Sequence, residues 1–105
     1  MLGAIPLLMI SLSITKHQHE TVVAACDEEL LGRELKENGV RLLVDEGFYG
    51  GEIVEAAELA GALRVCTIGN LVGKEAVEAA ISAGFVDREC CIFIEGVPHA
   101  QIVSM

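Results

Sequence analysis

Apolar and polar side chains alternate strictly in the stretch "ISLSITK", which spans residues 10–16. Ile10, Leu12 and Ile14 fall on one face of an extended chain, and the serines and threonine between them fall on the other. This pattern predicts a half-buried strand. After the polar tip "KHQHE", the run "TVVAAC" begins with β-branched residues and predicts a second strand that pairs back as a hairpin.

Turn signals organise the next part of the chain. Asp27 is the expected N-cap of a single helical turn through "EELLG". Asn38-Gly39 is a strong hairpin signal before the apolar strand 40–44, although a loop that feeds this one strand is an open alternative. The segment "DEGFYGG" has three glycines and two aromatic residues in seven positions, which predicts a loop.

Two helices are predicted from apolar residues at helical spacing. The first runs from Ile53 to Leu63, and its alanine-rich face suits close packing against a sheet. The segment "RVCTI" predicts a short strand after it. The second helix lies in "NLVGKEAVEAAISAG", where Asn70 is the expected N-cap and Gly84 the C-terminal cap.

The end of the chain has the pattern of an antiparallel pair. "CCIFIE" predicts a buried strand, "GVPHA" a turn, and "QIVSM" a last short strand. The strand, helix and strand between Arg64 and Glu95 predict a right-handed crossover unit. We therefore expect an α/β fold, with α+β as the open alternative. The expected architecture is a single two-layer domain in which two main helices pack mainly on one face of a mixed β-sheet.

The length of 105 residues is typical of one domain, which we place at residues 10–105. Residues 1–9 form an apolar N-terminal extension. This extension has no basic flank and contains a proline, which argues against a signal peptide or a membrane span. Because the alternation that starts at Ile10 needs nothing before it, Met9 is a candidate for the true start.

Charge and cysteine usage narrow the class of partner and the compartment. Sixteen acidic residues against seven Lys and Arg give a formal charge of -9, which repels phosphate backbones and anionic membranes. Bare nucleic acid and membranes are therefore not the expected partners. The cysteines lie in apolar runs and predict reduced, buried thiols in a cytosolic protein. These cysteines are Cys26, Cys66, Cys90 and Cys91.

The stretch "IGNLVGKEAV", residues 68–77, is close to a phosphate-binding loop. Such a loop needs four residues between its glycines and a hydroxyl residue after the lysine. Here only three residues lie between Gly69 and Gly73, and Lys74 is followed by Glu75. The favoured interpretation is therefore a helix start. Free amides at that start, together with Lys74, would still suit a single anion.

The histidines give little support for catalysis or metal binding. His17 and His19 have a spacing that suits metal ligands, but they lie in a polar turn without an obvious third ligand. His99 lies beside Pro98, and no nucleophile motif accompanies it, so a structural role is favoured. Tyr49 is expected to anchor its loop as a core aromatic residue. We predict no catalytic residue, no metal and no cofactor.

Three segments flank the predicted strand ends: the glycine-rich loop with "FYGG", the start of the second helix at residues 70–74, and the proline turn "GVPHA". Ligands often bind at such strand ends in sheets with crossover helices. Whether these loops converge is left open by the sequence. The candidate binding surface comprises Phe48, Tyr49, Gly50, Gly51, Asn70, Gly73, Lys74, Pro98 and His99.

Several segments together resemble an archaeal family called domain of unknown function 424. They are "VVAACDEELLG", "FYGG", "NLVG" followed by "AV", and "GVPHAQIV". The resemblance runs from near Ile10 to Val103, and "FYGG" and "GVPHAQ" are its most specific parts. It implies an archaeal cytoplasm, and it carries no established activity or catalytic residue to this chain.

The leading functional hypothesis is a non-catalytic binding or accessory protein. A basic protein is the expected class of partner for an acidic domain. The proteins that coat ribosomal RNA are basic, so a role in translation is the first association that we consider. The alternative is a small enzyme or ligand-binding domain that holds an anionic metabolite at a helix N-terminus. In that case Lys74 is the counter-charge, Tyr49 a donor and His99 the acid or base. A homodimer formed by edge strands is a third hypothesis.

Overall fold

The computed structural model of the chain describes residues 9–104, so residues 1–8 of the predicted apolar extension lie outside the described part. The alternating segment forms the predicted hairpin. β1 (Ile10–His17) pairs antiparallel with β2 (Glu20–Asp27) along its whole length, with Gln18 and His19 in the turn. Ile10 and Leu12 are buried on one face of β1.

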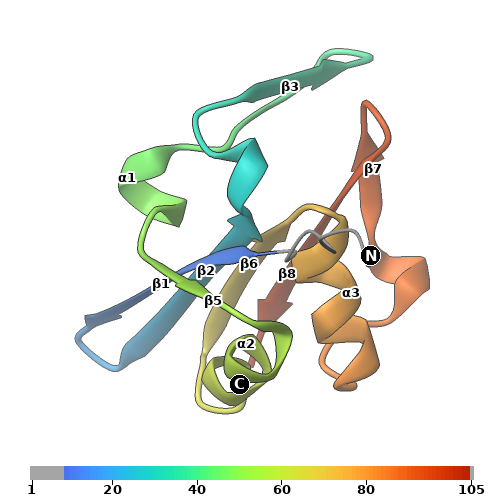
Figure 1. Cartoon of the computed structure of the whole chain (residues 1–105). Coiled ribbons are helices and arrows are strands. Elements are labelled where there is room, and N and C mark those ends of the chain that lie inside the picture. The colour runs from blue at the N-terminus through green and yellow to red at the C-terminus, as the bar shows by residue number, and fades with distance from the viewer. Residues whose placement is uncertain (1–8, 105) are drawn as a thin grey trace, which may run out of the picture.

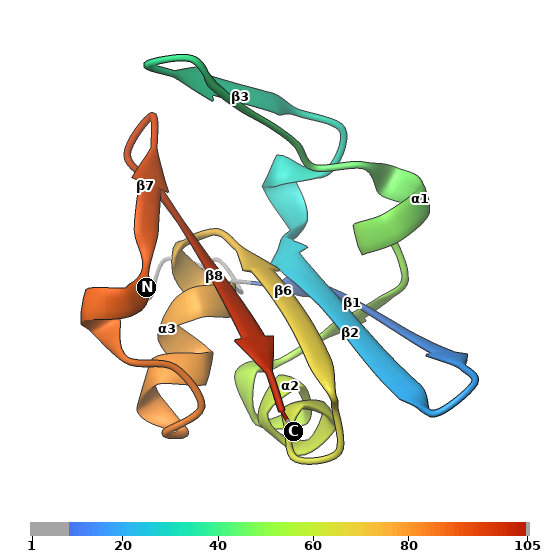
Figure 2. The same cartoon turned by 180° about the vertical axis from the view of Figure 1, so that it is seen from behind.

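A six-stranded mixed sheet is built around this hairpin (Figures 1 and 2). Its other strands are β5 (Glu52–Val54), β6 (Ile68–Val72), β7 (Ile92–Ile94) and β8 (Val97–Val103). The order is β5-β1-β2-β6-β8-β7, and β2 and β6 are its parallel neighbours. β6 and β7 are both antiparallel to β8, so they run in the same direction. α3 (Lys74–Ser82) connects them, which confirms the predicted strand–helix–strand unit.

The two main helices lie together on one face of the sheet (Figure 2). α2 (Ala56–Leu63) and α3 pack on the side chains that β2 and β6 direct toward this face. Leu59, Leu71 and Val77 are buried in this larger core. The alanines of both helices allow close approach to each other and to the strands. The predicted two-layer fold class is therefore confirmed.

One end of the opposite face is covered by short elements (Figure 1). They are η1 (Glu28–Leu30), α1 (Glu46–Tyr49) and a separate hairpin of β3 (Glu34–Glu37) and β4 (Val40–Leu43). Leu35, Val44 and Tyr49 form a second core there with Cys26 and Ile94. Asn38 and Gly39 have φ values of 51° and 82°, which confirms the hairpin that the sequence predicts.

Several predicted boundaries are wrong. The first main helix begins at Ala56, because Ile53 and Val54 belong to β5 and Glu55 forms a capping box with Glu58. Within "RVCTI", all but the last residue precede β6, which starts at Ile68. The glycine-rich loop "DEGFYGG" contains the helical turn α1. All of "GVPHA" but Gly96 lies in β8, and the turn before β8 is made by Glu95 and Gly96.

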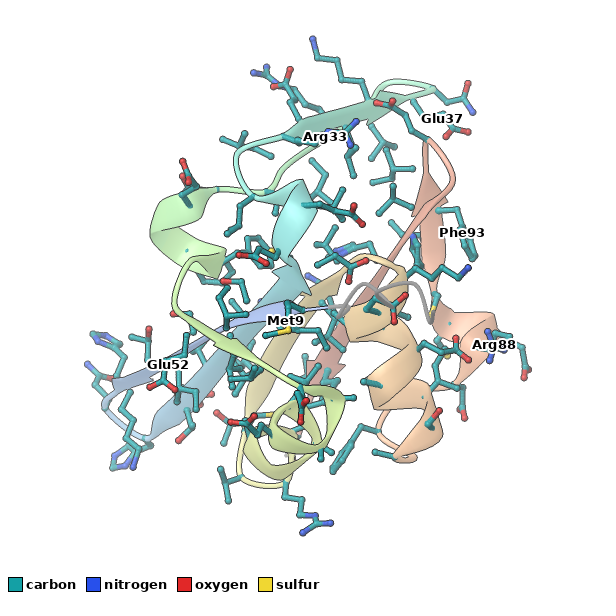
Figure 3. The ribbon with its side chains drawn as sticks, in the orientation of Figure 1. Met9, Arg33, Glu37, Glu52, Arg88 and Phe93 are labelled. Atoms are coloured by element: carbon teal, nitrogen blue, oxygen red, sulfur yellow. The ribbon has the colours of Figure 1, made fainter. Side chains whose placement is uncertain are left out.

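The cysteine prediction is confirmed in part. Cys26 and Cys66 are buried free thiols, as expected. Cys90 is exposed and Cys91 is half-buried, because η2 (Arg88–Cys90) precedes β7 on the surface. "CCIFIE" was expected to be a buried strand, but β7 is an edge strand. Phe93 projects outward from it (Figure 3).

Candidate functional site

The first amides of α3 are held by a side chain from a distant strand. Asp27 is the last residue of β2, which runs parallel to β6, so its carboxylate reaches the end of β6. The backbone N–H of Glu75 donates to Asp27 Oδ2 at 3.1 Å, and that of Ala76 donates to Oδ1 at 2.9 Å. Asp27 therefore caps α3, whereas its side chain makes no capping bond to the helical turn that follows it.

Burial and hydrogen bonding act in opposite directions on this carboxylate. Asp27 is 5% exposed, and burial raises its pKa above the ordinary value, while the bonds from Ala76 and Glu75 partly offset that rise. Gly73 precedes the helix with a φ of 112°, and a Cβ added there would overlap the Asp27 carboxylate. The cap therefore requires glycine at position 73 for both conformation and space.

This arrangement corrects two predictions. Asn70 does not cap α3, because it lies within β6, and its Oδ1 accepts a hydrogen bond from Gln101 Nε2 at 3.1 Å. The helix start is also not open to an anion. The Asp27 carboxylate already occupies the amides of Glu75 and Ala76, and its charge would repel a second anion.

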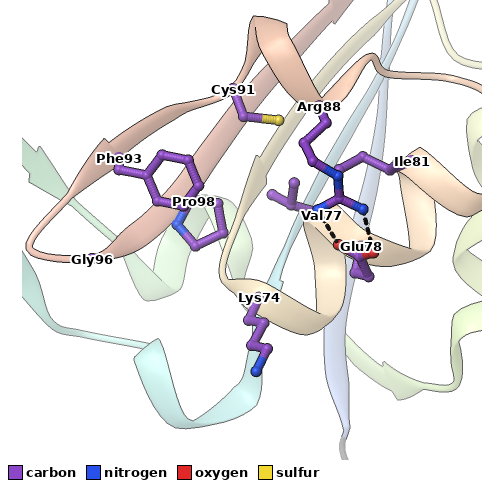
Figure 4. Close-up of a pocket in the computed structure, with 9 residues that line it drawn as sticks. All are labelled: Lys74, Val77, Glu78, Ile81, Arg88, Cys91, Phe93, Gly96 and Pro98. Carbon is purple, nitrogen blue, oxygen red and sulfur yellow. Dashed lines mark hydrogen bonds and ion pairs between the residues drawn. The ribbon is translucent and has the colours of Figure 1, made fainter.

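A groove of about 340 Å³ lies between α3 and the β7–β8 hairpin (Figure 4). Val77 and Ile81 line it from the helix, and Phe93 and Pro98 line it from the two strands. Phe93 and Pro98 are directly paired across β7 and β8, so both face this side of the sheet. Phe93 remains 60% exposed. The groove is therefore an apolar surface that is open to solvent.

The charged rim of the groove contains one bidentate ion pair and one further cation. Arg88 Nη1 and Nη2 donate to Glu78 Oε2 and Oε1 at 3.1 and 2.7 Å, and the hydrogen bond from Arg88 lowers the pKa of Glu78. Arg88 is therefore neutralised locally. The further cation is Lys74, which has no ion-pair partner among residues 9–104. Lys74 lies at the N-terminal end of α3, where the helix dipole disfavours a positive charge.

Cys91 also lines the groove, with Sγ 3.7 Å from the carbonyl oxygen of Asp87. Burial raises the pKa of this thiol above its ordinary value, with Cys90 as a smaller cause. Cys91 is therefore a protonated thiol at neutral pH and not an activated nucleophile. Within residues 9–104, no cluster of three or more His, Cys, Asp and Glu side chains has a metal-binding arrangement.

His99 lies in β8 beside Pro98, but its side chain serves the sheet. Its Nδ1 donates to the carbonyl oxygen of Leu71 at 2.9 Å, since a carbonyl oxygen can only accept. His99 pairs with Val72 on one side and Ile92 on the other, and it faces away from the groove. This bond supports the structural role that the sequence favours.

The "FYGG" segment lies on the far side of the sheet from the groove. Tyr49 is 4% exposed in the second core, which confirms it as an anchor, and burial raises its pKa to about 12. Phe48 packs against it edge to face, with ring centroids 5.0 Å apart. Gly50 and Gly51 pass so close to the backbone of α1 and β1 that an added Cβ would overlap carbonyl oxygens.

Comparison with known proteins identifies the family. The profile of the family described as "Protein of unknown function (DUF424)" matches residues 14–105. The chain belongs to the DUF424 family. No curated protein matches it. An uncharacterised conserved protein from the archaeon Methanopyrus kandleri has a similar crystal structure, with a TM-score of 0.77 and 30% sequence identity. The similarity covers 92% of this chain and 94% of that one.

The predicted surface of this DUF424 protein divides into separate parts. Gly73 and Lys74 meet Pro98 at the groove, where the N–H of Gly73 donates to the Pro98 carbonyl at 2.9 Å. Asn70 and His99 lie in β6 and β8 with side chains on the opposite sheet face, and Phe48 to Gly51 lie at α1 and β5. The three loops therefore do not form one surface.

The sequence analysis does not identify Phe93, the exposed large hydrophobic residue of the groove, because "CCIFIE" has the composition of a buried strand. The edge position of β7 follows from the strand order of the sheet, which no local sequence signal gives. In the described part of this DUF424 protein, the longest helix, α3, has nine residues, and no helix has the length and apolarity to span a membrane.

Proposed function

We propose that this DUF424 protein is a non-catalytic accessory protein of the archaeal cytoplasm that binds a basic partner protein at the groove between α3 and the β7–β8 hairpin. The observation that carries the proposal is the exposure of Phe93 beside this apolar groove. Aromatic side chains that border pockets are frequent energetic centres of protein interfaces.

The apolar surface extends over both faces of β7. Phe93 is 60% exposed on the groove side, and Ile92 is 52% exposed on the other side. Complete burial of a fully exposed side chain of this size contributes about 1.5–3 kcal/mol, and covering the exposed part of Phe93 would supply about half of that or slightly more. A partner segment with one apolar anchor in the groove would gain this contribution without rearrangement of the protein backbone.

The charge of the chain supports a basic partner. The formal charge is -9, and exposed Glu89 and Glu95 flank β7 on either side. Opposite charge on the partner speeds encounter and disfavours nucleic acid and other acidic proteins. Proteins that coat ribosomal RNA have this chemistry, so translation is the first process in which we would look for the partner.

The anionic-ligand alternative has less support. It needs free amides at the start of α3, and these amides already bind Asp27. It also assigns His99 an acid–base role, whereas His99 donates to the Leu71 carbonyl and faces away from Lys74 and the groove. Lys74 alone remains available as a counter-charge.

Capture from a lysate of an archaeon that encodes the protein tests the proposal. The bait is the tagged protein in three forms: wild type, Phe93→Asp and Val65→Asp. Val65 is 66% exposed between α2 and β6, outside the groove, so it is the matched control. Thermal unfolding of each bait checks that it is folded.

We expect basic proteins that remain bound after nuclease treatment, that are lost with Phe93→Asp and that are retained with Val65→Asp. Binding that disappears with nuclease would place the contact on RNA and overturn the proposal. Equal capture by both variants would also overturn it, because the groove would then have no role.

A further inference from the structure

The groove between α3 and the β7–β8 hairpin stays open to solvent in the part of the chain from residue 9 to residue 104. Phe93 is 60% exposed beside it, and Ile81 and Pro98 are half-buried in its walls. Water therefore contacts an apolar surface of the kind that usually marks an interaction site. An uncharged apolar segment is the chemistry that fits this surface, because its burial leaves no unpaired charge.

The chain enters the described structure close to this groove. The carbonyl oxygen of Met9 accepts a hydrogen bond from the N–H of Glu28 at 3.0 Å (Met9 is labelled in Figure 3). Glu28 follows Asp27, whose carboxylate binds the first amides of α3. Lys74 begins this helix and lines the groove. Residues 1–8 are therefore attached to the domain beside the α3 end of the groove.

Phe93 is within reach of a segment that is attached at Met9. In the sheet order, β7 is four strands away from β1, which is about 19 Å at a strand spacing of about 4.8 Å. A polyproline II segment advances about 3.1 Å per residue, so Leu2 can lie about 22 Å from Met9 and Ile5 about 12 Å. Leu2 can therefore reach Phe93, while Ile5 reaches the α3 wall of the groove.

The sequence of residues 1–8, "MLGAIPLL", suits such a segment. It contains no charged side chain. Pro6 disfavours the helical conformation for Ile5 and favours an extended one. Leu2, Ile5 and Leu8 recur at every third residue, and a polyproline II helix has three residues per turn, so it places these side chains on one face.

We propose that residues 1–8 of this chain cross the groove as an extended strap, with Leu2 against Phe93 and Ile5 against the α3 wall. Because the strap is tethered beside the groove, its effective concentration there is on the order of millimolar. A partner protein that binds the groove has to displace the strap, so its apparent affinity falls with the fraction of molecules in which the groove is open. This consequence rests on the proposed function, whereas the strap itself does not.

NMR spectroscopy of the isotope-labelled full chain tests the strap without a partner. We expect nuclear Overhauser effects between the Leu2 methyl protons and the Phe93 ring in the wild type. Phe93→Asp should remove the ring-current shift of these methyl groups. Val65→Asp, at an exposed site outside the groove, should leave that shift unchanged. The proposal would be overturned if residues 1–8 gave no Overhauser effect to the groove, or if the Leu2 methyl shifts were equal in the wild type and Phe93→Asp.

Thiol labelling gives a second readout in which the groove itself is unaltered. Cys91 lines the groove, and the adjacent Cys90 is exposed and serves as an internal reference. Leu2→Asp should open the strap and raise the rate of Cys91 labelling relative to Cys90 about tenfold. Ala4→Asp changes the charge equally but lies off the face that Leu2 shares with Ile5, so it should leave this ratio unchanged.

Equal ratios in the wild type and Leu2→Asp, or an equal rise in Ala4→Asp, would overturn the proposal. Thermal unfolding of each variant checks that the domain is folded. Neither measurement uses a partner, so the strap and the proposed partner binding can fail independently.

Discussion

Removal of the Asp27 carboxylate should destabilise the protein more than any other single change at a helix start. In Asp27→Ala, the amides of Glu75 and Ala76 lose their acceptor, and the bond from Ala76 is buried. Loss of a side-chain cap costs about 0.5–2 kcal/mol, and a buried amide without a partner costs about 1–3 kcal/mol. The variant also no longer buries an ionised carboxylate, which offsets part of the loss.

The expected net loss in the free energy of unfolding is about 2–3 kcal/mol, a large part of the 5–15 kcal/mol typical of a domain. Urea unfolding followed by circular dichroism at pH 7 measures this loss. Asp45→Ala is the matched control. Asp45 occupies the N-cap position of α1 without a side-chain capping bond and is exposed, so its removal should change stability by less than about 0.5 kcal/mol.

The pH dependence of Asp27→Asn gives an independent check. Burial raises the pKa of Asp27 above 3.8, so the folded protein holds the proton more tightly than the unfolded chain. This contribution to stability is full below pH 3.8 and is lost as the pH rises through the folded pKa. The stability of the wild type relative to Asp27→Asn should therefore fall across that range. Equal losses for Asp27→Ala and Asp45→Ala at pH 7 would refute the capping role.

Three further predictions use the same kind of local argument. Gly73→Ala should lower the free energy of unfolding by about 2 kcal/mol or more, because the new Cβ overlaps Asp27. Gly61→Ala in α2 has open space around the new Cβ and should raise the free energy of unfolding by about 0.5–1 kcal/mol. Urea unfolding compares the two variants. Tyr49, the single tyrosine, should ionise near pH 12 in the folded protein and near pH 10 in urea, and absorbance at 295 nm measures both midpoints. The contribution of this raised pKa to stability is lost as the pH rises through about 12. Equal midpoints in the two states would contradict the burial of Tyr49. A thiol reagent at pH 8 should modify exposed Cys90 in the native protein. Cys26 should react only after unfolding, because burial raises the pKa of its thiol to about 12. Mass spectrometry of the labelled peptides shows which cysteine has reacted.

The sequence predicts elements well where the determining signal is local. The alternation from Ile10 and the Asn38-Gly39 turn each produce a hairpin through residues that are adjacent in the chain. The site depends on contacts that are distant in sequence. Asp27 was assigned to the helical turn that follows it, but the parallel pairing of β2 and β6 directs its carboxylate to α3.

The predicted position of β6 is wrong because it also depends on contacts that are distant in sequence. "RVCTI" has the higher strand propensity, because "IGNLV" contains Gly and Asn, yet the pairing of Ile68 to Val72 with β2 and β8 places the strand in "IGNLV". With the strand placed there, Asn70 no longer precedes the helix. The exposure of Phe93 follows from the position of β7 at the sheet edge, and local composition carries no information on strand order.

The central claim is that the groove beside Phe93 is where a partner protein binds. The most direct test replaces Phe93 with the photoreactive residue benzoylphenylalanine, irradiates the protein in archaeal lysate and identifies the cross-linked products. The same residue at Val65 is the control. Our account predicts a discrete product with a basic protein from position 93 and none from position 65. The same product from both positions, or no protein product from position 93, would contradict it.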